Sequence, residues 1–336
     1  MAKELGVTYV LEGSVRRMGD RIRITAQLVE GKTGSNLWAE NFDGATADIF
    51  DVQDQITASV AAVVGTKIEL AEIDRSSRKR PENLDAYDYY LRALQKLYTY
   101  LDADNLAAIT LLHQAIALEP DFALALAWAA YGYEHRVTMG WDPASPDDGA
   151  KALELAHAAI AVTRDDPIVL ARCGFVLQAI GREYDLGLQT ILRAVNSNPN
   201  NVTVLFIAGA GHVWGGDLVA AMAMFKRVIQ LSPGDTAGAM TGVAHGLICL
   251  GRHEEALDWA SRSLAEQPNF DVTHWLFIAA LAHLGRISEA EKALAALLKL
   301  APASTIKRLS QSNGEKYPER WAVVLDGLRL AGMAEK

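Results

Sequence analysis

Apolar and polar residues alternate along the first part of the chain. Between residues 22 and 28 every second position is apolar, which is the period of a strand with one buried face. Similar stretches at about 8–17 and 36–42 are separated from it by short turns that contain glycine. We therefore predict a three-stranded antiparallel meander.

A helical period follows the third predicted strand. Apolar residues recur at steps of three and four over about 48–70, at Ile49, Val52, Ile56, Val60 and Val63. A stripe of this kind can cover one face of a sheet. We predict a small α+β domain at 1–72 and a charged linker at 73–85.

The remaining chain contains an internal repeat. Prolines close apolar helical stretches at intervals of 34 or 35 residues, at Pro199, Pro233, Pro268 and Pro302. A glycine in each unit can end a first helix in a left-handed conformation, at Gly216, Gly251 and Gly285. An alanine follows where a second helix must pack closely, at Ala221, Ala256 and Ala290. The period predicts a pair of helices in each unit.

This pattern resembles the tetratricopeptide repeat over roughly 86–302. The resemblance implies about six helix pairs stacked into an α-α superhelix with a concave inner face, so the fold class is mainly α behind a small α+β domain. A segment at 136–148 is longer than the usual turn and is predicted to be an insertion. Residues 303–336 contain an amphipathic helix, which we expect to cap the array.

The sequence also resembles bacterial class III adenylate/guanylate cyclase homologues and some winged-helix regulators. The stretches that carry this likeness are 2–17, 21–29, 37–40, 48–56 and 325–332. In those proteins a catalytic or DNA-binding domain precedes the corresponding region, and the α+β unit begins further upstream. The resemblance implies either a fragment of a longer protein or an incomplete sheet that pairs with another chain as a homodimer.

Charge and composition restrict the partners. The net charge is -9, which disfavours nucleic acid and anionic membranes because both attract basic surfaces. No stretch reaches the roughly 20 apolar residues that span a bilayer. The two cysteines, Cys173 and Cys249, form no metal-binding pair. We expect a cytoplasmic protein with a protein or peptide partner.

The sequence contains no complete catalytic, cofactor-binding or metal-binding motif. Gly31–Thr33 lacks the earlier glycine of a phosphate loop, because Ala26 stands there. The glycines between 209 and 216 have the wrong spacing for a dinucleotide site. The eight histidines show no i, i+4 helical metal pair. We expect no cofactor and no metal, and a chain that is not an enzyme.

The repeat frame selects candidate residues for partner binding. First-helix positions that face the concave side in such repeats are Arg172, Phe206, Trp214, Thr241, His245, Trp275 and His283. Aromatic rings and imidazoles offer a peptide stacking surfaces and hydrogen bonds, although several of these side chains could instead pack between repeats. We interpret the chain as an interaction and regulatory module. The alternative is the C-terminal regulatory part of a cyclase or transcriptional regulator.

Overall fold

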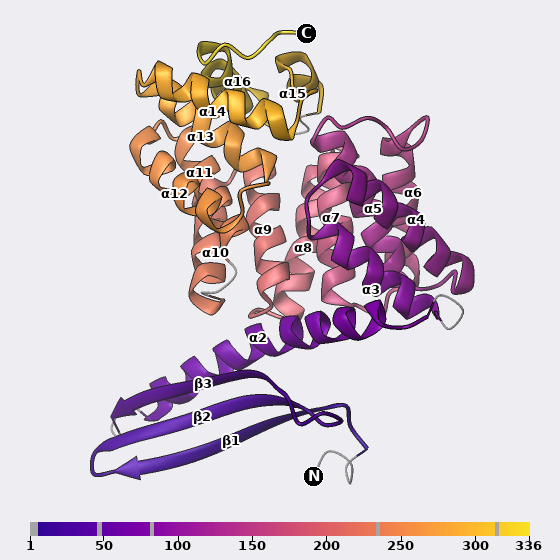
Figure 1. Cartoon of the computed structure of the whole chain (residues 1–336), viewed down its shortest axis with the longest axis vertical. Coiled ribbons are helices and arrows are strands. Elements are labelled where there is room, and N and C mark those ends of the chain that lie inside the picture. The colour runs from indigo at the N-terminus through magenta and orange to yellow at the C-terminus, as the bar shows by residue number, and fades with distance from the viewer. Residues whose placement is uncertain (1–5, 46–48, 81–83, 233–235, 313–315) are drawn as a thin grey trace. The chain divides into compact units, whose positions relative to one another are not determined.

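The computed structural model describes residues 6–45, 49–80, 84–232, 236–312 and 316–336. The chain divides into two compact units, Met1–Pro81 and Glu82–Lys336 (Figure 1). The helix of the first unit, α2, runs from Ile49 to Ser77, so the linker predicted to begin at residue 73 is helical at its start. Ile73, which lies beyond the predicted end of this helix, is buried.

The first unit contains the predicted meander. Its strands are β1 (Tyr9–Met18), β2 (Arg21–Glu30) and β3 (Asn36–Ala45), with β2 in the centre. Ile22, Ala26 and Leu28 are buried on one face of β2, and α2 packs against β3 and β2. The side chains of Ile49 and Val52 lie outside the described residues.

The edge strand β1 keeps much of its apolar surface exposed. Leu11 lies opposite Leu28, and Val15 lies opposite Ile24, so both continue the apolar side of the sheet. Leu11 is 49% exposed and Val15 is 65% exposed. Among the described strands β1 pairs with β2 alone, and an apolar edge of this kind is suited to association with another strand.

The second unit is an array of antiparallel helix pairs. Its helices, in pairs, are α3 (Ala86–Leu97) and α4 (Asp102–Leu118), α5 (Ala123–Thr138) and α6 (Asp148–Val162), α7 (Pro167–Ala179) and α8 (Tyr184–Ser197), α9 (Val202–Gly215) and α10 (Leu218–Leu231), α11 (Ala237–Cys249) and α12 (His253–Glu266), α13 (Asp271–His283) and α14 (Ile287–Leu300). The fold class predicted from the repeat is confirmed. Pro233 lies outside the described residues.

The repeat landmarks have the expected conformations. Gly216, Gly251 and Gly285 all have positive φ, at 94°, 72° and 75°, so each turn uses the left-handed region that favours glycine. The alanines at 221, 256 and 290 are completely buried. The second helix therefore approaches the first closely in each of these pairs.

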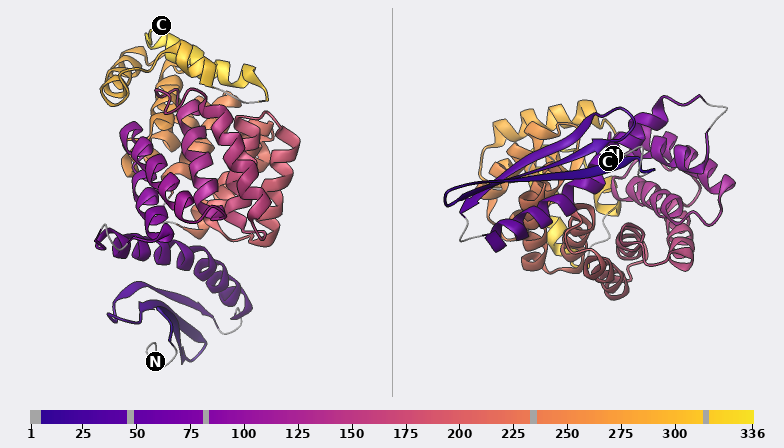
Figure 2. Two further views of the ribbon diagram at one scale, coloured as in Figure 1. Left: turned by 90° about the vertical axis from the view of Figure 1, so that its right-hand side faces the viewer. Right: turned by 90° about the horizontal axis from the view of Figure 1, so that it is seen from below.

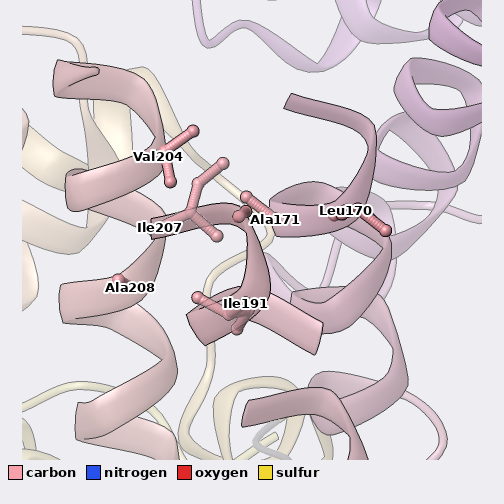
Figure 3. Packing of buried hydrophobic residues seen from close by; sticks show 7 residues of the cluster. Leu170, Ala171, Ile191, Val204, Ile207 and Ala208 are labelled. Atoms are coloured by element: carbon pink, nitrogen blue, oxygen red, sulfur yellow. The ribbon is translucent and has the colours of Figure 1, made fainter. Parts of the chain in front are cut away.

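The core lies between successive helix pairs. Leu170 and Ala171 of α7 pack with Ile191 of α8 and with Val204 and Ile207 of α9 (Figure 3). Because each pair buries the apolar face of its neighbour, the stack shares one continuous core.

Glycines make room for a ring from α10. Phe225 is buried, and a Cβ at Gly209 would lie 2.6 Å from its Cε1 atom. Gly242 of α11 meets the same ring from the other side. Gly209 and Gly242 therefore serve the packing between helices.

The predicted insertion is shorter than 136–148. α5 continues to Thr138 and α6 begins at Asp148, so the loop covers 139–147. Arg136 anchors it: its Nε donates to the carbonyl of Asp142 at 2.9 Å, and its guanidinium pairs with Asp102 at 2.7 Å. Helix α5 therefore includes residues 136–138 of the predicted insertion.

Candidate functional site

The inner face of the array is formed by the first helix of each pair. The helices α5, α7, α9, α11 and α13 contact one another in succession. Figure 2 shows the C-terminal helices, in yellow, beside the last helices of the array. All seven predicted partner-binding residues lie on these first helices.

The C-terminal segment, residues 303–336, folds onto this inner face. It contains α15 (Ile306–Ser312) and α16 (Pro318–Leu330). α16 packs against α13 and α11, which are both first helices. The segment predicted to cap the array thus lies against the first helices of the last two pairs.

Trp321 is the centre of this contact. The side chain is 7% exposed, and its Nε1 donates to the carbonyl of Leu309 at 3.2 Å. The edges of its ring meet His245 at 5.8 Å and Trp275 at 5.9 Å between centroids. Two of the predicted groove residues thus hold a tryptophan of the same chain.

Polar contacts fix the segment along its length. His283 hydrogen-bonds through Nε2 to the carbonyl of Val323 at 2.8 Å. The backbone N–H of Lys316 donates to the carbonyl of Trp214 at 3.0 Å, and Arg320 donates to the carbonyl of Gly216 at 2.7 Å. His283 and Trp214, two further predicted residues, therefore also contact the C-terminal segment.

Close packing accompanies these bonds. Gly327 of α16 lies on α13, where a Cβ would be 2.6 Å from the Cα of Ala279. Only glycine allows the two helix backbones to approach this far. The sequence at this position is therefore matched to the inner face.

Burial changes the interpretation of three predicted residues. Thr241 is 4% exposed and hydrogen-bonds to Ser263 at 2.8 Å and to Thr273 at 2.7 Å. Trp275 is 2% exposed beneath α16. Phe206 packs against Phe225 at 5.8 Å. In this conformation Thr241 and Trp275 are not available to a partner, and Phe206 contributes to the packing between α9 and α10.

Arg172 stands apart from the covered half of the inner face. Its guanidinium lies over the ring of Trp128, 3.3 Å from the centroid, and 4.6 Å from that of Tyr131. Glu134 and His135 lie on the same helix as these rings. Desolvation by burial raises the pKa of Glu134 to about 7 and lowers that of His135 to about 3.

The sequence reasoning selected Arg172 but missed its neighbours on α5. The turn after the first helix of that repeat is far longer than in the other repeats, so the concave positions were not assigned in it. The spacing of Trp128, Tyr131 and His135, at steps of three and four, is the signal that could have placed them on one helix face.

The first and last helix pairs of the array contact each other. Tyr100, in the turn after α3, lies 4.9 Å from Phe270 at the start of α13. Trp141 of the loop hydrogen-bonds to Asp271, which offsets part of the effect of burial that raises the pKa of Asp271 to about 6. Arg308 pairs with Asp142 at 2.5 Å. The loop 139–147 thus touches both α13 and the C-terminal segment.

Within the described residues no three His, Cys, Asp or Glu side chains are grouped as metal ligands. None of the helices, as far as the structure describes them, is long and apolar enough to span a membrane.

Comparison with known proteins gives one curated relative and a set of structural neighbours. The chain is 36% identical over 167 residues to "Putative adenylate cyclase 3" of Rhizobium meliloti (strain 1021), which covers 50% of this chain and 28% of that protein. No protein-family model matches. The chain thus spans under a third of the length of this curated relative.

Solved structures support the architecture. The structure "Human IFIT1 dimer with m7Gppp-AAAA" has a TM-score of 0.57 at 13% identity, and the match covers 75% of this chain and 60% of that chain. The Cut9-Hcn1 structure of the APC/C has a TM-score of 0.52 at 14% identity, with coverage of 78% and 49%. At these identities the likeness shows the fold alone. The chain is a tetratricopeptide-type helical array behind a small α+β unit, with a distant likeness to a protein named as an adenylate cyclase.

Proposed function

We propose that the chain is a non-catalytic interaction module whose inner face binds amphipathic helical segments. The observation that carries this proposal is the position of α16. This helix of the chain itself already occupies part of the inner face, which we call the α16 seat and which the repeat pattern predicts to bind partners. Trp214, His245, Trp275 and His283 all contact the C-terminal segment. A partner helix with the same apolar stripe would compete for these contacts.

The chemistry of the seat defines the preferred partner. In α16 the aromatic side chain that it binds is Trp321, and the small residue that packs closely on it is Gly327. Buried aromatic anchors contribute most of the affinity in many interfaces. The partner is therefore a helix with a tryptophan, followed six positions later by glycine or another small residue.

A competition experiment tests this proposal on intact chains. A fluorescent peptide with the sequence of residues 316–336 is titrated against the full-length protein and against its Trp321→Ala variant. We expect tighter binding to the variant, because its own helix is easier to displace. The peptide carrying the same alanine should bind more weakly to both proteins.

Trp259→Ala is the matched control for this experiment. Trp259 lies on the second helix α12 with Arg262 over its ring at 4.3 Å, away from the contact of α16. It should bind the peptide like the unmodified protein. Equal affinity of all three proteins would contradict the proposal.

The alternative is that this chain is the regulatory part of a longer cyclase or regulator. The 36% identity to the Rhizobium meliloti protein favours it. Sequencing the gene on both sides of the coding region and measuring cyclic nucleotide formation by the complete product would distinguish the two. An in-frame catalytic domain with activity would support the alternative.

A further inference from the structure

Two arginines of the array have very different surroundings. Arg136 is buried and fully engaged, with carboxylate partners at Asp102 and Asp148 and a further bond to Asn105. Arg172 is half-buried and has no carboxylate within ion-pair distance among the described residues. A largely covered charge without a counter-charge is costly, so proteins normally pair it.

The Nε atom of Arg172 is inaccessible and has no hydrogen-bond partner. The guanidinium carbon lies 3.3 Å from the centroid of the Trp128 ring. The two terminal nitrogens of the guanidinium carry its other donors, and these are left for another group. A planar carboxylate is the group that such a fork binds through two parallel bonds.

The helix α5 supplies three further unpartnered polar atoms. Trp128 is 2% exposed, Glu134 is 1% exposed and His135 is 9% exposed. Their Nε1, Oε2 and Nε2 atoms have no hydrogen-bond partner within the described part of the chain. Buried polar groups are almost always satisfied in native proteins, so four such atoms on neighbouring turns of α5 and α7 point to a ligand.

We infer that Arg172, Trp128, Glu134 and His135 form a binding site for a small carboxylate with an apolar or aromatic body. Arg172 binds the carboxylate, and the rings of Trp128 and Tyr131 form the apolar wall. Tyr131 and Arg172 keep part of their surface accessible, so a ligand can reach them.

The charges of the site favour a monoanion over a phosphate dianion. Arg172 is the cation of this cluster, and burial keeps His135 neutral by lowering its pKa to about 3. Burial also raises the pKa of Glu134 to about 7, so a share of this carboxyl is protonated at neutral pH and can donate a hydrogen bond. A second negative charge on the ligand would have no counter-charge.

Calorimetric titration of the full chain tests this inference with benzoate as the probe. We expect benzoate to bind, and benzamide, which has the same shape without the charge, to bind at least about tenfold more weakly, as the loss of a charge-assisted bond implies. Inorganic phosphate should also bind more weakly. Equal affinity for benzoate and benzamide, or no binding of benzoate, would overturn the inference.

Two variants separate the site from general charge effects. Arg172→Gln should lower the affinity for benzoate by at least about tenfold, whereas Arg172→Lys should retain part of it. Arg193→Gln is the control, because Arg193 is exposed and pairs with Asp165 at 2.7 Å. Equal losses in the Arg172→Gln and Arg193→Gln proteins would contradict a specific site. Circular dichroism of each variant checks that the array remains folded.

The proposed carboxylate site and the proposed helix-binding surface can be refuted independently of each other. The carboxylate site uses α5 and α7, and the seat of α16 uses α11 and α13. Benzoate binding that persists in the Trp321→Ala variant would support the carboxylate site whatever the outcome of the peptide competition.

Discussion

Replacing Trp321 by alanine removes the largest apolar contact between the C-terminal segment and the inner face. Full burial of a tryptophan removes up to about 250 Å² from water, worth about 6 kcal/mol at 25 cal/mol per Å². The side chain is 7% exposed, so nearly all of this applies, and the alanine and structural relaxation recover part. Substitutions of this kind cost about 3–5 kcal/mol, and we expect a loss of this size.

Urea unfolding measures this loss, and hydrogen exchange locates it. If α16 leaves the inner face, amides of α16 and of the underlying α13 should exchange faster, whereas those of α3 and α4 should change little. Trp259→Ala, at a half-buried site on the outer helix, should cost about 1 kcal/mol. A Trp321→Ala protein no less stable than the Trp259→Ala protein would refute the assigned role of Trp321.

Three further predictions test other features. Gly216→Ala should lower stability by about 1–3 kcal/mol more than Gly251→Ala; both have positive φ, but only at Gly216 would the new Cβ meet Tyr317, and thermal unfolding measures the difference. Burial raises the pKa of the Glu134 carboxyl from 4.5 to about 7. The folded state therefore favours the protonated carboxyl, so the free energy of unfolding falls as the pH rises from about 4.5 through 7. Glu134→Gln should therefore gain up to about 3 kcal/mol over the unmodified protein at pH 8.5 and little at pH 4; a pH-independent difference would contradict this. The exposed β1 surface should support a dimer in light scattering that Val15→Lys dissociates, and a monomer at every concentration would exclude it.

The helices of the array were predictable because each repeat carries its own local signals. The positive φ at Gly216, Gly251 and Gly285 is a property of single residues, and the burial of Ala221 follows from the neighbouring helix of the same pair. These features depend on residues close in sequence. A period of 34 or 35 residues repeats them often enough to be recognised.

The position of the C-terminal segment was not predictable from its own pattern. The stripe that includes Val324 and Leu328 shows that α16 buries one face, but it contains no information on which surface receives that face. The contact joins His245 and Trp275 to Trp321, across a separation that no local period spans. For the same reason the aromatic neighbours of Arg172 were not predicted, because they belong to the preceding repeat.

The contact between Tyr100 and Phe270 changes how the array should fold and evolve. In an open solenoid each repeat contacts only its neighbours, so repeats can unfold from an end and can be gained or lost one at a time. Here the turn after α3 and the loop 139–147 contact the start of α13. A contact of such long sequence separation slows folding and couples the first repeat to the last. Deleting a middle repeat would shift Phe270 relative to Tyr100 and break this contact, so the number of repeats is fixed by geometry.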